Sequence, residues 1–261
     1  MTGPLKGQVA VVTGANRGLG AEIASDLAAA GASLAISARD RSSLGETTSA
    51  VAAHGGQVMA LECDVTEPRS ADRMAREVLD HYGRVDTVVA NAGIAGPTNL
   101  MHEMDYDAWR ECVATDLDGV FLTLRRFIPS MIGAGRGSLI AISSATGKRP
   151  LQGRTPYAAA KMGVIGLMRT LAIEVGPHGI RANSICPGAV DGPRIRAVFA
   201  AEAERFQTTP EAALRQFTDP AALGRLVDAR EVAAACVFLA SPAASGVTGE
   251  DINVSAGLVM Y

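Results

Sequence analysis

Short apolar segments alternate with longer segments of helical period along almost the whole chain. The short segments are rich in β-branched or aliphatic residues and cover residues 8–13, 33–38, 57–62, 85–90, 137–143, 180–185 and 250–255. Each is too short for a typical helix and predicts a strand. Apolar residues three and four positions apart predict helices in segments such as 21–31, 71–83, 106–132 and 158–176. Strands that are apolar throughout and alternate with helices favour an α/β fold, a doubly wound parallel sheet with helices on both faces.

The length and composition limit the number of domains and the kind of partner. A chain of 261 residues, 48% of them hydrophobic, can bury one large core, so residues 1–261 are expected to form a single domain. Residues 189–227 interrupt the alternation and predict a helical excursion or lid within it. A net charge of -3 without a basic run gives no electrostatic footprint for nucleic acid or a membrane surface. A small-molecule substrate fits this composition better.

The cysteines, the histidines and the N-terminus bear on location and metal binding. The four cysteines form no C-x-x-C pair, which favours buried reduced thiols over disulfides or a zinc site. The four histidines are scattered without ligand spacing, so no metal is predicted. The first strand begins too early for a signal peptide, and no apolar run is long enough to span a bilayer. We therefore expect a cytoplasmic protein.

A glycine-rich turn, TGANRGLG at residues 13–20, joins the first strand to the first helix. At the carboxyl edge of a doubly wound sheet, the N-terminus of this helix offers unpaired N–H groups to a pyrophosphate. Gly14 can adopt the backbone angles of the turn, Gly18 leaves room for the phosphate, and Gly20 permits close packing of helix on strand. A turn used only for packing is the alternative, and further residues must decide between the two.

Three further motifs follow in a fixed order. Asn91, Ala92 and Gly93 come directly after a strand, Ser144 ends another, and the segment Tyr157–Lys161 opens a helix thirteen positions later. With T-G-x-x-x-G-x-G and Pro187-Gly188, this order resembles the short-chain dehydrogenase/reductase family over nearly the full chain. The resemblance implies a Rossmann-type fold, a nicotinamide cofactor, and hydride transfer to a ketone or from a secondary alcohol. It assigns the cofactor contacts to Gly14, Asn16, Arg17, Gly18, Leu19, Gly20, Arg39, Asp64, Val65, Asn91, Ala92, Gly93, Tyr157, Lys161, Pro187, Gly188 and Val190.

The chemistry of carbonyl reduction explains the residue types in this pattern. Hydride arriving at a carbonyl carbon leaves an alkoxide, so an acid must lie within hydrogen-bond reach of the oxygen. Tyr157 suits that task, and Lys161 faces the same side of the helix one turn later. A cation about 4 Å from a phenol, at an effective dielectric of about 20, favours the phenolate by about 4 kcal/mol before screening. In the family, the lysine also binds the nicotinamide ribose, and the serine at Ser144 bonds the reacting oxygen.

Two positions depart from the family pattern. The family has a catalytic asparagine in N-x-x-G, where this chain has Asp116-Leu117-Asp118-Gly119. An aspartate could preserve the water that this residue helps to hold in the family, or its charge could pair with Lys161. The family also commonly has a threonine that touches the nicotinamide carboxamide, where this chain has Gly192. The backbone of Val190 remains available for that contact.

The end of the second strand bears on the choice of nicotinamide. Many NAD-preferring members carry an acidic residue there, and its carboxylate would repel a 2′-phosphate. This chain has Ala38 at that position and Arg39 next, with Arg17 on the same side. Two arginines could clamp the phosphate, so NADP(H) is favoured over NAD(H). The alternative is that Arg39 stacks on adenine while Arg17 pairs with Glu22 or with solvent.

A basic loop and the segment after the sixth strand bear on the substrate. Lys148, Arg149 and Arg154 lie in the loop that borders the substrate pocket in this family, and they could receive an anionic group or form a solvated loop or subunit contact. Residues 193–217 would cover the pocket and exclude water. A weakly catalytic nucleotide-binding scaffold subunit remains as the alternative function. The resemblance also implies a homodimer or homotetramer that pairs through helices at 106–132 and 157–175.

Overall fold

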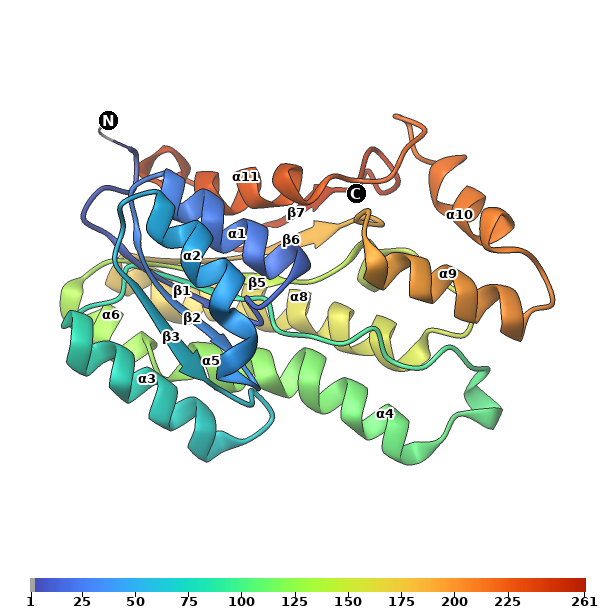
Figure 1. Ribbon diagram of the computed structural model, residues 1–261, viewed down its shortest axis with the longest axis horizontal. Helices are drawn as coiled ribbons and strands as arrows, with labels where there is room; N and C mark the ends of the chain where they lie inside the picture. The colour runs from blue at the N-terminus through green and yellow to red at the C-terminus, as the bar shows by residue number, and fades with distance from the viewer. Residues whose placement is uncertain (1–2) are drawn as a thin grey trace.

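The computed structural model describes residues 3–261 and contains one seven-stranded, fully parallel sheet (Figure 1). The strand order is β3-β2-β1-β4-β5-β6-β7, with the crossover between β3 and β4. The strands are β1 Val9–Thr13, β2 Ser33–Ala38, β3 Val58–Glu62, β4 Thr87–Ala90, β5 Gly137–Ile142, β6 Ile180–Pro187 and β7 Asp251–Val254. The sequence prediction of a doubly wound, Rossmann-type sheet is confirmed, and each predicted strand is present within about three residues of its predicted ends.

Helices cover both faces of the sheet. They are α1 Gly18–Ala29, α2 Gly45–Ala53, α3 Pro68–Tyr82, α4 Tyr106–Val113, α5 Gly119–Arg125, α6 Ile128–Ala134, α7 Ala145–Lys148, α8 Thr155–Val175, α9 Pro193–Arg205, α10 Pro210–Thr218 and α11 Ala229–Ala240. One core lies between the sheet and α1, α2 and α11, and a second lies between the sheet and α3, α5 and α8. Side chains of a strand alternate between the faces, so Val12 joins the first core and Val11 the second. The cysteines are free and buried, as the sequence predicted.

The single helix expected over residues 106–132 is wrong. The segment is divided into α4, a π-helical turn at Ala114–Asp118, α5 and α6. The break before α6 has a local cause, because Pro129 in its first turn has no N–H to continue the preceding helix. The π turn has no comparable sequence signal. None of the helices in residues 3–261 is long and apolar enough to cross a bilayer.

Helices α9 and α10 lie beyond the carboxyl ends of the strands, away from both layers (Figure 1). They have a small apolar cluster of their own, in which Phe199 of α9 contacts Phe217 of α10 with ring centroids 5.4 Å apart. Leu151, from the loop before α8, packs against this cluster. The residues that interrupt the strand–helix alternation therefore form a separate pair of helices at the same edge as the sequence motifs.

Candidate active site

The carboxyl ends of β1 and β4 are joined by side chains of the sequence motifs. The Asn91 amide donates to the carbonyl oxygens of Thr13 (2.9 Å) and Gly14 (3.1 Å). The Thr13 hydroxyl in turn accepts bonds from the backbone N–H groups of Asn91 and Ala92, at 3.1 and 3.2 Å. These bonds hold the glycine turn against the loop that follows β4.

The glycines of the turn differ in what surrounds them. Gly14 has a φ of 64°, and a Cβ added there would lie 2.8 Å from the Cα of Ala92. A Cβ on Gly20 would lie 2.2 Å from the Gly14 carbonyl oxygen, so this position requires glycine for close packing. A Cβ on Gly18, at the first position of α1, would meet no heavy atom within 4 Å. Open space at the N-terminus of a helix is what a phosphate group needs, so the turn fits a dinucleotide.

Tyr157 and Lys161 lie one turn apart on α8, which passes beside the end of β5. The Lys161 ammonium is buried and donates to the carbonyl oxygen of Ile142 at 3.0 Å. It lies 5.6 Å from the centre of the Tyr157 ring. Ser143 fixes the helix by donating its hydroxyl to the Lys161 carbonyl oxygen at 2.7 Å. Ser144, the next residue, is buried and caps α7, its hydroxyl accepting the N–H of Thr146.

Asp116 is fully buried in the π turn and takes part in the same cluster. One carboxylate oxygen accepts the N–H of Ile94 at 2.9 Å and lies 3.7 Å from the Lys161 ammonium. The second lies 3.7 Å from the sulfur of Cys112, whose pKa is raised to about 12 by burial and then by the Asp116 charge. Of the two roles considered for this aspartate, pairing with Lys161 is the one with a direct contact. A Cβ on Gly93 would lie 2.4 Å from the Asp116 oxygen, which explains glycine there.

The arginines expected near the adenosine ribose are available for a ligand. Arg39 follows the buried Ala38 and is exposed, and Arg17 precedes α1 and is also exposed. Within residues 3–261, neither forms an ion pair, and Glu22 binds Arg230 at 3.2 Å instead of Arg17. Pairing of Arg17 with Glu22, one part of the alternative considered for these arginines, is therefore wrong, whereas the other part, in which Arg17 faces solvent, agrees with its exposure.

The remaining expected contacts line the same edge. Asp64 forms a tight turn after β3, accepting from the N–H (2.9 Å) and hydroxyl (2.7 Å) of Thr66. Val65 packs closely on Gly119, because a Cβ added to Gly119 would lie 2.8 Å from the Cγ2 atom of Val65. Gly188 continues from β6 by donating its N–H to Val254, and Val190 pairs with Val227 in an isolated bridge.

Known proteins resemble this chain over nearly its whole length. A family model described as enoyl-(acyl carrier protein) reductase matches residues 14–259. The 3-oxoacyl-(acyl-carrier-protein) reductase of Vibrio cholerae is 36% identical over 256 residues, which cover 98% of this chain and 99% of that protein. Among solved structures, a variant of actinorhodin polyketide ketoreductase with NADPH aligns with a TM-score of 0.92, 32% identity and 100% coverage of both chains. Carveol dehydrogenase from Mycobacterium avium with NAD aligns with a TM-score of 0.91 and 30% identity, covering 98% of this chain and 99% of that one.

The chain belongs to the short-chain dehydrogenase/reductase family. It is therefore an NAD(P)-dependent oxidoreductase that acts on keto and hydroxy groups. The family resemblance seen in the sequence is confirmed over nearly its whole length. The choice between NADP(H) and NAD(H) is not decided by the neighbours, since NADPH is bound in one and NAD in another.

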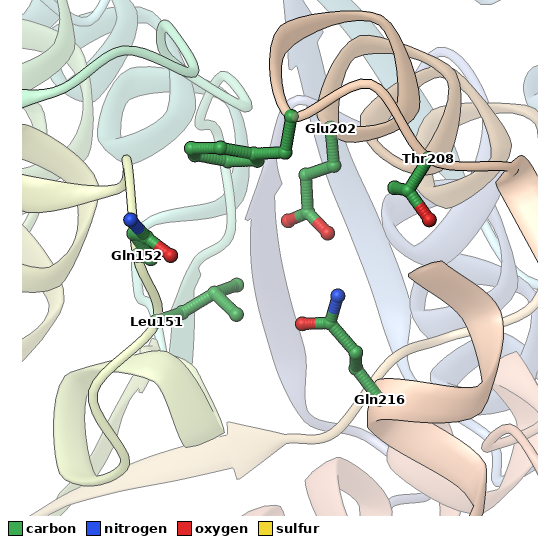
Figure 2. A pocket seen from close by; sticks show the side chains of 6 residues that line it. Leu151, Gln152, Glu202, Thr208 and Gln216 are labelled. Atoms are coloured by element: carbon green, nitrogen blue, oxygen red, sulfur yellow. The ribbon is translucent and has the colours of Figure 1, made fainter. Parts of the chain in front are cut away.

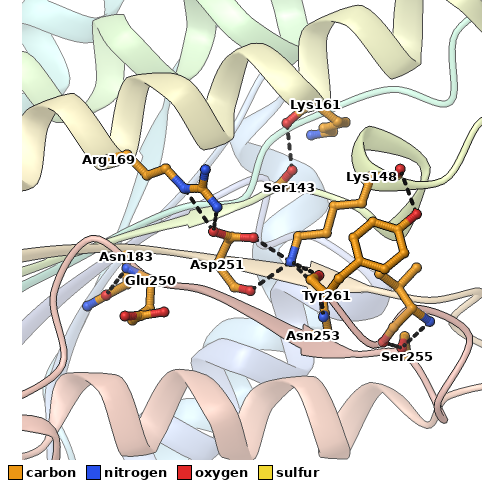
Figure 3. A network of polar contacts seen from close by, with 11 residues as sticks. Ser143, Lys148, Lys161, Arg169, Asn183, Glu250, Asp251, Asn253, Ser255 and Tyr261 are labelled. Atoms are coloured by element: carbon orange, nitrogen blue, oxygen red, sulfur yellow. Dashed lines mark hydrogen bonds and ion pairs between the residues drawn. The ribbon is translucent and has the colours of Figure 1, made fainter.

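The three loop cations of this dehydrogenase/reductase have separate roles. Lys148 bonds Asp251, Asn253 (2.9 Å) and the Tyr261 carbonyl oxygen (2.8 Å), as Figure 3 shows. Burial alone would raise the pKa of Asp251, but bonds from Lys148 and Arg169 hold it below its usual value. These side chains tie the C-terminal segment to the loop after β5.

Arg149 and Arg154 stay near the site. Arg149 lies 3.4 Å from the Gln216 carbonyl oxygen on α10. Arg154 is 4% exposed, donates to the Thr98 hydroxyl at 3.0 Å and to the Ala95 carbonyl oxygen, and lies 5.2 Å from the centre of the Tyr157 ring. Of the three cations, Arg154 is the one that contacts Tyr157.

Sequence reasoning missed Glu202, an acidic residue of α9 that is only 2% exposed. A signal was present, because Val198, Phe199, Glu202 and Ala203 follow the spacing of one buried helix face, and all four are buried. An acidic residue on an apolar helix stripe is rarely buried without a partner or a function.

Proposed function

We propose that the protein transfers a hydride between NADP(H) and a ketone or secondary alcohol, with Tyr157 as the acid and base. The observation that carries the proposal is the fixed ammonium of Lys161 beside Tyr157. Its bond to the Ile142 carbonyl oxygen and its contact with Asp116 hold it in place, so it acts on the phenol without reorganisation.

The bound nicotinamide supplies or accepts the hydride. In the reductive direction, the Tyr157 hydroxyl donates a proton to the carbonyl oxygen, and the Ser144 hydroxyl donates a hydrogen bond to the same oxygen. Lys161 stabilises the phenolate that remains, and Asp116 balances the buried ammonium. In the oxidative direction, the same phenolate takes the proton of the alcohol.

The cofactor is proposed to lie along the carboxyl edge of the sheet. The free space at Gly18 would take the pyrophosphate, and Asn16, Leu19 and Gly20 belong to the same turn. Arg17 and Arg39 would bind the 2′-phosphate of NADP(H), supported by their exposure and by the absence of an ion-pair partner for either within residues 3–261. Preference for NAD(H) is the alternative.

The cofactor contacts nearest the reacting carbon are proposed to come from the end of β6 and the segment that follows it. Pro187, Gly188 and Val190 would border the nicotinamide, where Gly192 supplies no side chain. Arg194 bonds the Gly93 carbonyl oxygen at 3.3 Å and so ties the start of α9 to the loop after β4. Residues 189–227 would act as the lid over the bound substrate.

A panel of substrates tests the function. We expect the purified protein to oxidise NADPH with at least one of an acetoacetyl thioester, a cyclic ketone and a ketose, measured by loss of reduced-cofactor absorbance. A crotonyl thioester serves as the control, because the matching family model is described as an enoyl reductase. Consumption of the crotonyl thioester alone would contradict carbonyl reduction, and no turnover of any compound would favour the scaffold alternative.

We also propose a homodimer or homotetramer in the cytoplasm. Phe121, Ile132, Met162 and Ile173 are large apolar side chains left exposed on α5, α6 and α8. Buried reduced thiols suit the reducing cytoplasm. A monomer mass by light scattering would refute the assembly.

A further inference from the structure

A cavity of about 210 Å³ lies between α9, α10 and the loop before α8. Its lining is mostly polar and consists of Leu151, Gln152, Glu202, Phe206, Thr208 and Gln216. Figure 2 shows the Glu202 carboxylate directed into the space between Leu151 and Gln216. The cavity therefore has a buried acid at its centre and amide groups on its walls.

One oxygen of the Glu202 carboxylate is left without a hydrogen-bond partner among residues 3–261. This atom, Oε1, is buried and accepts no bond from any residue in that range. Burial raises the pKa of Glu202, and Arg154 lowers it by a smaller amount. The Arg154 guanidinium is near enough to influence the carboxylate but does not form an ion pair with it among the described residues. A buried acceptor without a partner is costly, and native proteins usually satisfy it with water or a ligand.

Arg154 connects this cavity to the reacting group. Its guanidinium lies 5.2 Å from the centre of the Tyr157 ring, and its own Nε is also buried without a partner. Gly153, the preceding residue, lies against α9, since an added Cβ would be 3.2 Å from the Phe206 ring. Leu151 and Gln152 line the cavity, and Arg154, which follows them by two positions, contacts Tyr157. A substrate that reached from Tyr157 into the cavity would pass Arg154.

We propose that Glu202 selects substrates that carry a hydroxyl group remote from the reacting carbonyl, by accepting a hydrogen bond from that hydroxyl. Gln152, Thr208 and Gln216 supply additional polar partners in the same cavity. A polyhydroxylated or hydroxy-cyclic ketone matches these groups, and an unbranched apolar chain would leave the acid unpaired. The inference rests on the proposed carbonyl reduction, and it defines the substrate class of the same site.

Two ketones that differ by one hydroxyl test the kinetic consequence. We expect kcat/KM for 4-hydroxycyclohexanone to exceed that for cyclohexanone by about tenfold or more, because a site built to bond a hydroxyl discriminates against its loss. Glu202→Leu should abolish this ratio while turnover of cyclohexanone persists, and Glu202→Gln, which keeps an acceptor oxygen, should retain part of it. Glu204→Leu, at an exposed position of the same helix, is the matched control and should keep the native ratio. If Glu202 has a purely structural role, Glu202→Leu would lower kcat/KM for both ketones in the same proportion, and this result would overturn the proposal.

Equilibrium binding separates this inference from the proposed function. On protein saturated with NADP⁺, calorimetry should give a tighter Kd for cyclohexane-1,4-diol than for cyclohexanol, and Glu202→Leu should remove the difference. Equal affinities in the native protein, including no binding of either, would overturn the role of Glu202. If no ketone or alcohol is turned over, the proposed function fails, and the calorimetric comparison still decides whether the hydroxyl subsite exists.

Discussion

The nucleotide side and the substrate side of the site are built from different parts of the chain. At the nucleotide side, the contacts are largely between backbone atoms and small residues, as where Gly20 meets the Gly14 carbonyl oxygen. At the proposed substrate side, long side chains are buried: Glu202 lines a cavity, and Arg154 contacts Tyr157. The backbone-built side leaves a fixed pattern of glycines in the sequence, whereas the side chains of the other side vary without disturbing the sheet.

This difference separates recognition of the cofactor from recognition of the substrate. A backbone cradle can take any dinucleotide and depends on few side chains for its preference. A cavity lined by side chains changes its ligand with each substitution. Tyr157 and Lys161 lie between the two sides and are proposed to serve both, so substitutions there should have the largest effect.

Tyr157→Phe is expected to lower kcat by about 10²–10⁴-fold, since it removes the proton donor and little volume. Nucleotide affinity, measured by calorimetry, should be nearly unchanged. Lys161→Ala should lower kcat and weaken nucleotide binding together, because the ammonium is proposed to act on Tyr157 and on the ribose. Retention of most of the turnover by Tyr157→Phe on a good substrate would end the proposed proton transfer.

Gly20→Ala is expected to destabilise the fold by about 1–3 kcal/mol, because the new Cβ meets backbone that can yield only by shifting α1 from β1. Urea denaturation measures the loss. Gly18→Ala is the informative partner, because a Cβ there meets no atom of residues 3–261 within 4 Å and its cost comes only from the positive φ of 56°. It should lose about 1–2 kcal/mol through backbone strain and should also weaken nucleotide binding, which Gly20→Ala does not target directly. Equal denaturation midpoints for the native protein and Gly20→Ala would show that close backbone packing at this turn does not contribute to stability. The contrast drawn between the two sides of the site would then be wrong.

Arg39→Asp tests whether an exposed side chain beside the glycine turn sets the preference for NADPH over NADH. The native protein should use NADPH with kcat/KM about tenfold or more above NADH, and the variant should reverse that order because a carboxylate repels the 2′-phosphate. Steady-state kinetics with both cofactors at one ketone concentration measure the preference. Equal efficiency with both in the native protein would refute the phosphate clamp.

Asp116→Asn should have the smallest effect, about threefold or less in kcat, since an amide oxygen can still accept the N–H of Ile94. The variant removes a negative charge 3.7 Å from the Lys161 ammonium. The full positive charge then favours the phenolate, so the pH profile of alcohol oxidation should move toward lower pH. An unchanged profile would show that the Asp116 charge does not reach the reacting group.

The parallel sheet and the glycine turn at its carboxyl edge were predictable from the sequence, because apolar period and glycine spacing reflect backbone geometry. The motif order also brought Ser144, Tyr157 and Lys161 to one edge, since parallel strands end together. Glu202 was missed because its burial depends on where α9 packs, which the sequence of α9 does not specify. The contacts of Lys148 and Arg154 were equally hidden: the two residues are six positions apart, yet Lys148 binds the C-terminal segment and Arg154 contacts Tyr157.

The π-helical turn at Ala114–Asp118 acts as one extra residue inserted into a helix. Each residue advances a regular helix by about 100° around its axis. One inserted residue therefore rotates the side chains of α5 by about that angle relative to those of α4. Substitutions preserve this offset, but loss of one residue would remove it and turn Asp116 away from Lys161. The length of this segment, more than its composition, therefore keeps Asp116 in contact with Lys161. A sequence aligned to this chain with a gap in this segment would not place an acidic residue at the equivalent position of the site.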